Sequence, residues 1–288
     1  MILIADSGST KTDWRLLGKD GQITQAKTQG FNPFYQDQET IEKELSEVLL
    51  PQLLGKPDEI HYYGAGISGE RNQQILHSAL LTTFPEAALI EVQNDLLASA
   101  RALCGSEEGI ACILGTGANC CVYNGEEIVS TVGGLGYVFG DEGSGASLGR
   151  QLLSEYLHHT LPKHLHEAFD KRYSTSRNEI LENVYKRPMP NRYLAGFSKF
   201  LFHHKNDPHI YRMIYLSFTE FMEKNVLKCT NHQHYKVHFV GSIAFYYSDI
   251  LRQVANDCHV ALRNVLETPI AGLSLYHQEQ AGISGRYL

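Results

Sequence analysis

The chain has 288 residues and a formal net charge of −7, with 43% hydrophobic and 20% charged residues. This composition is typical of a globular protein, and the length is enough for two domains that each bury a core. The acidic balance argues against nucleic-acid binding, which requires a basic surface. No apolar run reaches the roughly 20 residues of a membrane span, and the first residues lack the basic start of a signal peptide. We therefore expect a cytoplasmic protein that binds neither nucleic acid nor membranes.

The first part of the chain predicts an α/β unit. An apolar run at 2–5 ends at the polar turn Asp6-Ser7-Gly8-Ser9-Thr10. Hydrophobic periodicity then distinguishes strands from helices. It predicts strands at 12–17 and 22–28, a helix at 39–54, a strand at 60–65, a helix at 70–81, a strand at 88–92, and a helix at 94–104 with Asn94 as its N-cap.

The same order of elements begins again at residue 110. The pattern predicts strands at 110–114, 119–123 and 127–132, a helix at 145–158, a helical insert at about 161–230, a strand at 236–240, a helix at 243–255, a strand at 258–262, and a helix at 269–280 with Pro269 at its first position. Two copies of one topology predict two α/β domains, 1–106 and 107–288, around a central cleft. The last helix is free to pack back on the first domain.

The cysteines predict no disulfide framework. All six lack a CxxC pair, and several lie in apolar runs such as 110–114, so we expect buried, reduced thiols. The 14 histidines show no ligand spacing for zinc.

Two turns of small residues follow equivalent strands of the two halves. They are Asp6-Ser7-Gly8-Ser9-Thr10-Lys11-Thr12 and Gly115-Thr116-Gly117-Ala118-Asn119. Small residues let backbone N–H groups approach a phosphate, and hydroxyls add donors. The P-loop spacing is absent, and either turn alone fits a plain hairpin. Their matched positions nevertheless indicate a pair of phosphate-binding loops, with Asp6 suited to hold Mg²⁺ through water.

Three further motifs are weaker on their own. The segment 133–145 contains six glycines before a helix. This pattern indicates either a backbone that packs tightly against a ligand or simply a flexible loop. Asp95 lies in the first turn of a helix, where a carboxylate is favoured for purely structural reasons. Gly241-Ser242 joins a buried strand to a helix. The glycine would let the backbone pack flat against a planar ring, and the start of the helix would favour an anion, but such junctions are common.

The motifs together resemble the BadF/BadG/BcrA/BcrD ATPase family of the actin-like ATPase and sugar-kinase superfamily, and within it the N-acetylglucosamine kinases. The resemblance covers essentially the whole chain and rests on five motifs in order: DSGSTKTD (6–13), GFNPF (30–34), NDLLAS (94–99), LGTGANC (114–120) with GGLGYVFGDEGSG (133–145), and FVGSIA (239–244).

The resemblance implies two duplicated actin-like (ribonuclease H-like) α/β domains and a role for each motif. The implied ATP-binding residues are Gly8, Ser9, Thr10, Lys11, Thr116, Gly117, Gly241 and Ser242, with Mg²⁺ at Asp6. The implied sugar-binding residues are Asn32, Ser68, Asp95, Asn119, Gly134 and Asp141, with Asp95 as the catalytic base. The expected substrate is an amino sugar, and a homodimer is left open.

Two positions depart from the mammalian N-acetylglucosamine kinases. Phe34 and Leu135 stand where that group carries tryptophan, and the present chain is shorter. These departures bear on the acetamide pocket rather than on phosphoryl transfer.

The implied reaction is ATP-dependent phosphorylation of N-acetylglucosamine at its primary hydroxyl. Asp95 would accept the proton while the two turns and Mg²⁺ stabilise the phosphates. Domain closure would exclude water, with hinges near 104–109 and 263–268. Alternatives are a glucosamine or other hexosamine kinase, a dehydratase-activating ATPase, a non-catalytic sugar or nucleotide sensor, and a filament-forming actin relative.

Overall fold

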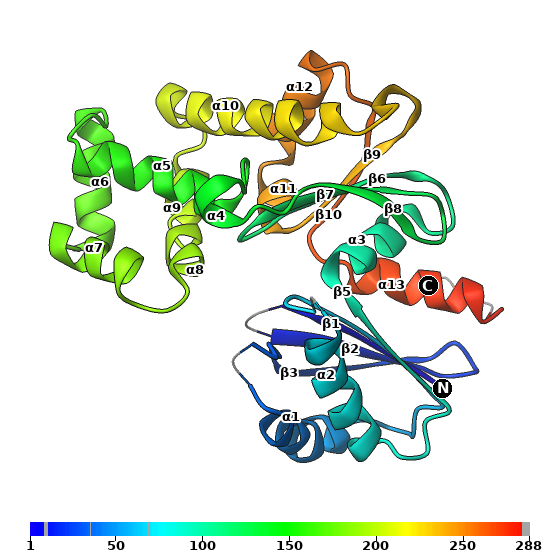
Figure 1. Cartoon of the computed structure of the whole chain (residues 1–288). Coiled ribbons are helices and arrows are strands. Elements are labelled where there is room, and N and C mark those ends of the chain that lie inside the picture. Colours follow the sequence, from blue (N-terminus) through cyan, green and yellow to red (C-terminus); the bar gives the residue numbers. More distant parts are fainter. Residues whose placement is uncertain (9–10, 35, 68, 284–288) are drawn as a thin grey trace. The chain divides into compact units, whose positions relative to one another are not determined.

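The computed structural model describes residues 1–8, 11–34, 36–67 and 69–283 (Figure 1). The chain forms two compact units. The first unit contains Met1–Glu107, Gly125–Glu127 and the segment from Thr268 onward, and the second contains Glu108–Asn124 and Ile128–Glu267. The last helix of the chain therefore belongs to the first unit.

The first unit is built on a mixed five-stranded sheet with the order β3-β2-β1-β4-β5. Its strands are β1 (Ile2–Ser7), β2 (Lys11–Leu17), β3 (Ile23–Gln29), β4 (Glu59–Gly64) and β5 (Leu89–Asn94). The first three strands form an antiparallel meander, while β1, β4 and β5 run parallel to one another. The carboxyl ends of these three parallel strands therefore lie at one edge of the sheet.

Helices cover both faces of this sheet. Leu3 and Ala5 of β1 belong to one buried core with residues of α1 (Gln38–Glu44) and α2 (Glu70–Thr83). On the other side lie α3 (Asp95–Cys104) and α13 (Ile270–Gln280) (Figure 1). The side chain of Asn94 accepts a hydrogen bond from the Leu97 N–H, which confirms the predicted cap of α3.

The predicted helix at 39–54 is only partly regular. After α1 the chain continues as a π-helical turn, Leu45–Leu49, and a 3₁₀ turn, Leu50–Gln52. Pro51 has no N–H to donate, so no α-helical hydrogen bond can form at that position.

The second unit repeats the topology of the first. Its sheet has the order β10-β9-β6-β7-β8. The strands are β6 (Gly109–Leu114), β7 (Ala118–Tyr123), β8 (Ile128–Gly133), β9 (Val237–Val240) and β10 (Leu262–Leu266). Again the first three strands form an antiparallel meander, and the last two add in parallel. The predicted duplication of an α/β fold is confirmed.

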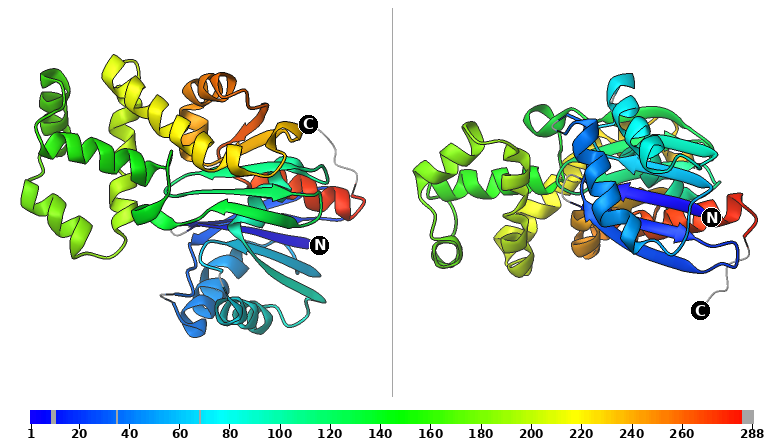
Figure 2. Two further views of the ribbon diagram at one scale, coloured as in Figure 1. Left: turned by 45° about the horizontal axis from the view of Figure 1, so that its top comes forward. Right: turned by 90° about the horizontal axis from the view of Figure 1, so that it is seen from below.

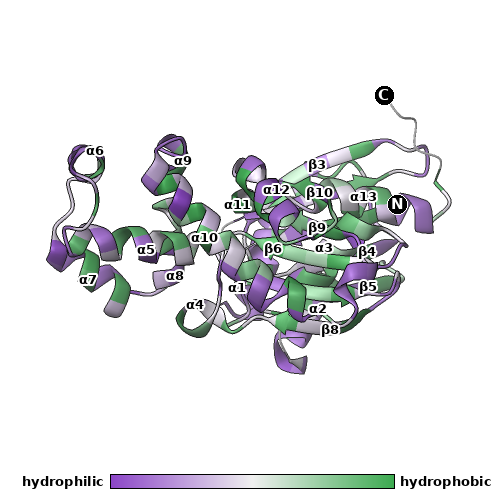
Figure 3. Ribbon diagram, turned by 90° about the horizontal axis from the view of Figure 1, so that it is seen from above, coloured by the Kyte–Doolittle hydropathy of each residue, from purple (hydrophilic) through white to green (hydrophobic). Residues whose placement is uncertain are grey.

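The insert of the second unit is helical, as predicted. It follows α5 (Gly145–Leu157) and contains α6 (Lys163–Tyr173), α7 (Arg177–Tyr185), α8 (Pro190–Ala195), α9 (Ser198–His203), α10 (Pro208–Lys224) and the 3₁₀ turns Val226–Lys228 and His232–His234. Helices α5 to α9, green in Figure 2, extend away from the sheet of this unit in both views. In Figure 3 these helices carry both hydrophobic and hydrophilic residues, whereas β6 and β9 are largely hydrophobic.

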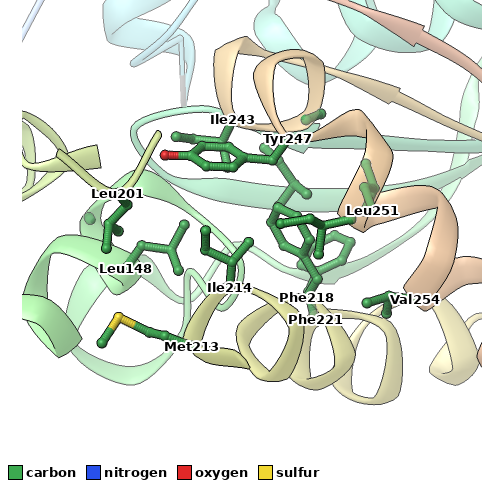
Figure 4. Close-up of a cluster of buried hydrophobic side chains, with 14 of the residues drawn as sticks. Leu148, Leu201, Met213, Ile214, Phe218, Phe221, Ile243, Tyr247, Leu251 and Val254 are labelled. Atoms are coloured by element: carbon green, nitrogen blue, oxygen red, sulfur yellow. The ribbon is translucent and has the colours of Figure 1, made fainter. Parts of the chain in front are cut away.

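Helix α10 is an integral part of the core of the second unit. Its residues Ile214, Phe218 and Phe221 are fully buried, and Figure 4 shows them packed with Leu251 and Tyr247. The Phe221 ring lies 5.9 Å from the Phe239 ring of β9, so this helix contacts the sheet directly.

Two predictions near the C-terminal end of the second unit are wrong. The helix expected at 243–255 is two helices, α11 (Ser242–Tyr246) and α12 (Ser248–Asp257). They are separated at Tyr247, whose hydroxyl donates to the Ser198 carbonyl across 2.6 Å. This tertiary contact is invisible in local periodicity.

The strand expected at 258–262 is the other error. His259 adopts φ 56°, and the N–H groups of His259 and Val260 donate to the carbonyls of Asn256 and Ala255. This pattern is a Schellman motif that ends α12, with apolar Val260 packing on the core. The strand, β10, begins only at Leu262. Pro269, expected inside the last helix, is instead its N-cap.

The six cysteines are free, and all but the half-buried Cys258 are buried, as predicted. The sulfur atoms of Cys112, Cys120 and Cys229 approach to 3.6 and 3.7 Å within the core of the second unit. Among the described residues, no helix has the length and apolar character needed to cross a membrane.

A buried polar cluster joins α13 to the sheet of the first unit. His277 Nε2 lies 2.9 Å from the Tyr63 hydroxyl, and its ring stacks on the His61 ring at 4.0 Å. Arg101 Nη1 donates to the same Tyr63 hydroxyl at 2.6 Å, and His61 Nδ1 lies 2.8 Å from a Glu91 carboxylate oxygen. Burial lowers the pKa of His277 to about 3, because the charged imidazolium would lose its hydration.

This depressed pKa predicts a pH dependence of stability. Unfolding restores an ordinary histidine pKa near 6.5, so below that pH the unfolded chain binds a proton that the folded protein does not. The free energy of unfolding is therefore undiminished above pH 6.5 and decreases as the pH falls toward 3. We expect His277→Gln to reduce the slope of the free energy of unfolding against pH by about 1.4 kcal/mol per pH unit between pH 6 and 4. Urea unfolding at several pH values measures this slope. His77→Gln, at an exposed histidine of α2, should keep the wild-type slope, and an unchanged slope in His277→Gln would contradict the assignment.

Candidate functional site

In the first unit, the hairpin between β1 and β2 places two carboxylates opposite each other. Asp6 and Asp13 are direct partners in the antiparallel register. The buried Asp13 carboxylate lies 2.7 Å from Lys11 Nζ and 3.7 Å from Lys27 Nζ. Sequence reasoning assigned Asp6 and Lys11 but not Asp13, although the hairpin register would have paired it with Asp6.

The same edge of the sheet carries Asp95, the first residue of α3 after β5. Burial is the main cause that raises the pKa of Asp6 to about 7, and the negative charges of Asp13 and Asp95 raise it further, while Lys11 lowers it. Burial also raises the pKa of Asp95 to about 6, against the lowering effect of nearby backbone N–H groups at the helix start. These carboxylates thus repel one another in a dehydrated environment, a common feature of functional sites.

A cation would relieve this repulsion. Among residues that the structure describes, no three histidine, cysteine or acidic side chains form a closed metal cage. Mg²⁺ does not require one, because it keeps several waters and takes only one or two carboxylates together with substrate phosphates. Asp6 and Asp13 fit that donor set.

The loop before α1 is tied to the first turn. Ser7 Oγ lies 2.8 Å from Thr12 Oγ1 and accepts a hydrogen bond from the Phe31 N–H at 3.2 Å. Asn32 follows, and its side-chain oxygen accepts from the Phe34 N–H at 3.0 Å. Asn32 and Phe34 lie against Gly66, where an added Cβ would be 3.0 Å from Asn32 Oδ1.

In the second unit, the turn between β6 and β7 is held by the start of α5. The carbonyls of Gly115 and Thr116 accept from the N–H groups of Gly145 and Ala146 at 2.8 and 3.0 Å. These bonds fix the backbone of the turn, which is a requirement for binding a ligand through N–H groups.

Gly241 approaches the same turn from β9. It has φ 122°, and an added Cβ would collide with the Leu114 carbonyl and lie 3.1 Å from the Gly115 nitrogen. Only glycine permits this conformation and this contact, so Gly241 and Ser242 lie beside the 115–118 turn.

Three more predicted site residues of the second unit, Asp141, Asn119 and Gly134, lie near the 115–118 turn. Asp141 is buried with φ 59°, and its carboxylate accepts from the Ala118 N–H at 3.0 Å. Burial raises the pKa of this carboxyl. The side chain of Asn119 would lie 3.3 Å from a Cβ at Gly134, so these two residues are neighbours.

The structure thus brings the site residues into two sets, one in each unit. The set of the first unit contains Asp6, Gly8, Lys11, Asn32 and Asp95. The set of the second contains Thr116, Gly117, Asn119, Gly134, Asp141, Gly241 and Ser242. Ser9, Thr10 and Ser68 lie outside the described residues.

Solved structures resemble essentially the whole chain. A candidate N-acetylglucosamine kinase from Porphyromonas gingivalis is 43% identical, with a TM-score of 0.92, and the match covers 98% of this chain and 100% of that one. The chain belongs to the N-acetylglucosamine kinase-like family. The mixed α/β sheets of the two units agree with the actin-like sugar-kinase fold predicted from the motifs.

More distant members of this fold group are similar in structure alone. A candidate N-acetylglucosamine kinase from Chromobacterium violaceum is 18% identical, with a TM-score of 0.72 and coverage of 96% of this chain and 98% of that one. The ROK hexokinase from Thermus thermophilus is 13% identical, with a TM-score of 0.54 and coverage of 97% and 99%. No family model and no curated protein matches the sequence.

The close approach at Gly241 predicts that a side chain at this position lowers the stability of the second unit. Gly241→Ala should destabilise the second unit by about 1–3 kcal/mol, because the added methyl group strains the backbone and displaces the turn. Thermal unfolding measures the loss. Gly115→Ala is the matched control, since nothing lies within 4 Å of a Cβ there. Equal shifts for the two variants would contradict this reading of the junction.

Proposed function

We propose that this protein transfers the γ-phosphate of ATP to the primary hydroxyl of an amino sugar, with N-acetylglucosamine as the first candidate. The observation that carries the proposal is the half-buried Asp95 carboxylate, with its pKa raised to about 6, at the same strand edge as Asp6 and Asp13. The 43% identity to a candidate N-acetylglucosamine kinase over the whole chain supports the substrate class.

In this proposal Asp95 orients the sugar hydroxyl and accepts its proton. A base works best when its pKa is close to the operating pH, since it is then deprotonated and still basic enough to take the proton. Dehydration around Asp95 provides that adjustment. Phosphoryl transfer has a loose transition state, so positioning by Asp95 contributes at least as much as proton transfer.

The phosphates of ATP would be bound by the two turns. In the first unit we assign this role to Gly8, Ser9, Thr10 and Lys11, and in the second to Thr116 and Gly117. Gly241 and Ser242 would border the adenosine, where flat backbone suits a planar ring. Asp6, with Asp13 beside it, would hold Mg²⁺, which when bound neutralises charge on the β- and γ-phosphate oxygens.

The sugar would be recognised by Asn32, Ser68, Asn119, Gly134 and Asp141. Amide and carboxylate groups make directional hydrogen bonds, and a site built from them rejects analogues that lack a hydroxyl. The 2-substituent would meet the exposed apolar side chains of Phe34 and Leu135. Apolar contacts discriminate a methyl-sized group by only about 1–3 kcal/mol, so selection at this position should be softer.

The role of Asp95 is tested by replacing it with an isosteric neutral side chain. Asp95→Asn should lower kcat about 10²- to 10⁴-fold, as expected for a lost base, while nucleotide binding is retained. A coupled ADP-release assay and nucleotide titration measure the two quantities. A variant that keeps more than about a tenth of wild-type kcat would rule out Asp95 as the base.

The substrate assignment is tested at Phe34. Wild type should prefer N-acetylglucosamine to glucose in kcat/KM, with glucosamine as the closest competitor. Phe34→Ala should narrow the gap between acetylated and free amino sugar and leave ATP kinetics nearly unchanged, because only the apolar wall is removed. Leu54→Ala, at another exposed apolar side chain of the first unit, is the control and should change neither. A preference of wild type for glucose would refute the amino-sugar assignment.

A further inference from the structure

Helix α10 of the insert lies directly against the glycine-rich segment that carries Asp141. The buried Ser217 hydroxyl accepts a hydrogen bond from the Gly143 N–H at 3.2 Å. Gly143 has φ 74°, and an added Cβ would be 3.1 Å from Phe221 Cβ and 3.4 Å from a Phe218 ring atom. The backbone at Gly143 therefore packs flat on one face of α10.

An ion pair binds the preceding residue to the same helix. Glu142 lies 3.0 Å from Lys224 Nζ, and only 13% of its side chain is exposed, against 54% for Lys224. Lys224 also pairs with Glu220, one turn earlier on α10, at 2.6 Å. A nearly buried carboxylate depends on its cation much more than an exposed one does. Of the two contacts of Lys224, the one with Glu142 should therefore matter more.

The start of the glycine-rich segment is also fitted to the end of this helix. Gly133 has φ 92°, and an added Cβ would collide with the Asn225 side-chain oxygen. Asn225 is itself buried and donates to the Phe221 carbonyl at 3.2 Å. The segment thus lies close to Asn225, the C-cap of α10, at residue 133, and is bonded to α10 at 142–143.

Asp141 is the residue that needs this support. It is not a glycine, yet it adopts φ 59°, a left-handed conformation that costs a non-glycine residue free energy, although less for aspartate than for most. On one side its carboxylate accepts from the Ala118 N–H, and on the other the chain is anchored at once by Glu142 and Gly143.

We propose that α10 is a positioning element of the sugar side of the site, and that Ser217 and Lys224 are positioning residues that hold Asp141 through Glu142 and Gly143. This inference rests on the proposed function, in which Asp141 binds a sugar hydroxyl. It assigns a role to the helical insert: α10, which packs in the core of the second unit, would hold the glycine-rich segment in place through its contacts with residues 142–143.

Kinetics of four variants test the inference. Ser217→Ala and Lys224→Met should each raise the KM for the sugar about five- to twentyfold, as the loss of a hydrogen bond or ion pair to a buried group predicts. The KM for ATP should rise less than the KM for the sugar, because Ser217 and Lys224 are connected to the 115–118 turn indirectly, through the Ala118–Asp141 and Gly145–Gly115 hydrogen bonds. The value of kcat should change less than about threefold. Lys224→Arg should restore the sugar KM, and Glu220→Gln should leave it at the wild-type value. Equal increases in the KM values for sugar and ATP, or an effect of Glu220→Gln as large as that of Lys224→Met, would overturn the proposal.

A second measurement does not depend on the substrate. Hydrogen–deuterium exchange of peptides covering 140–145 should be faster in Ser217→Ala and Lys224→Met than in wild type and Glu220→Gln. Unchanged exchange in the first two variants would also overturn the positioning role. If wild type phosphorylates no hexosamine, the proposed function fails, and the exchange measurement alone then decides whether α10 holds the segment.

Discussion

The proposed chemistry depends on a group of buried and half-buried carboxylates at the carboxyl edge of three parallel strands. The pairing of β1 with β4 and of β4 with β5 fixes where Asp6 and Asp95 lie, and the β1–β2 hairpin adds Asp13. Dehydration and mutual repulsion raise the pKa of Asp6 to about 7 and burial that of Asp95 to about 6. A sheet edge that stores this unfavourable charge is suited to bind a cation and to accept a proton near neutral pH.

The second unit has the same topology but a different set of side chains at the equivalent strand edge. Its β6–β7 turn holds no acidic residue of its own, and the carboxylate that contacts it, Asp141, comes from the glycine-rich segment before α5. Backbone rather than side-chain charge dominates this set, with Gly241 packed against the turn and the start of α5 bonded to it. Duplication thus supplied two equivalent strand edges, one suited to cations and proton transfer and the other to anions and hydroxyl groups.

Local patterns in the sequence predicted what depends on neighbours along the chain. The strand–turn–strand repeats, the Asn94 cap and the buried thiols all follow from short-range composition. The break at Tyr247 does not, because it accompanies a hydrogen bond to Ser198, far away in the sequence. The apolar run at 258–262 was misread because a helix end with an apolar contact has the same composition as a short strand.

The site shows the same division. Most residues of the candidate site were assigned from motifs, but the pairing of Asp13 with Asp6 requires the hairpin register, and the support from α10 joins residues 74 and 82 positions apart. No periodicity in the sequence encodes such pairs.

The most direct test of the account is the pH dependence of kcat/KM for N-acetylglucosamine, measured by ADP release with saturating MgATP. Two carboxylates that must be ionised, Asp6 with a pKa of about 7 and Asp95 with a pKa of about 6, predict that the logarithm of kcat/KM falls with a slope of one below pH 7 and a slope approaching two below pH 6. In Asp95→Asn the residual rate should keep only the slope of one that protonation of Asp6 causes. A wild-type rate that stays constant down to pH 4.5, or a limiting slope that is the same in wild type and Asp95→Asn, would contradict the account.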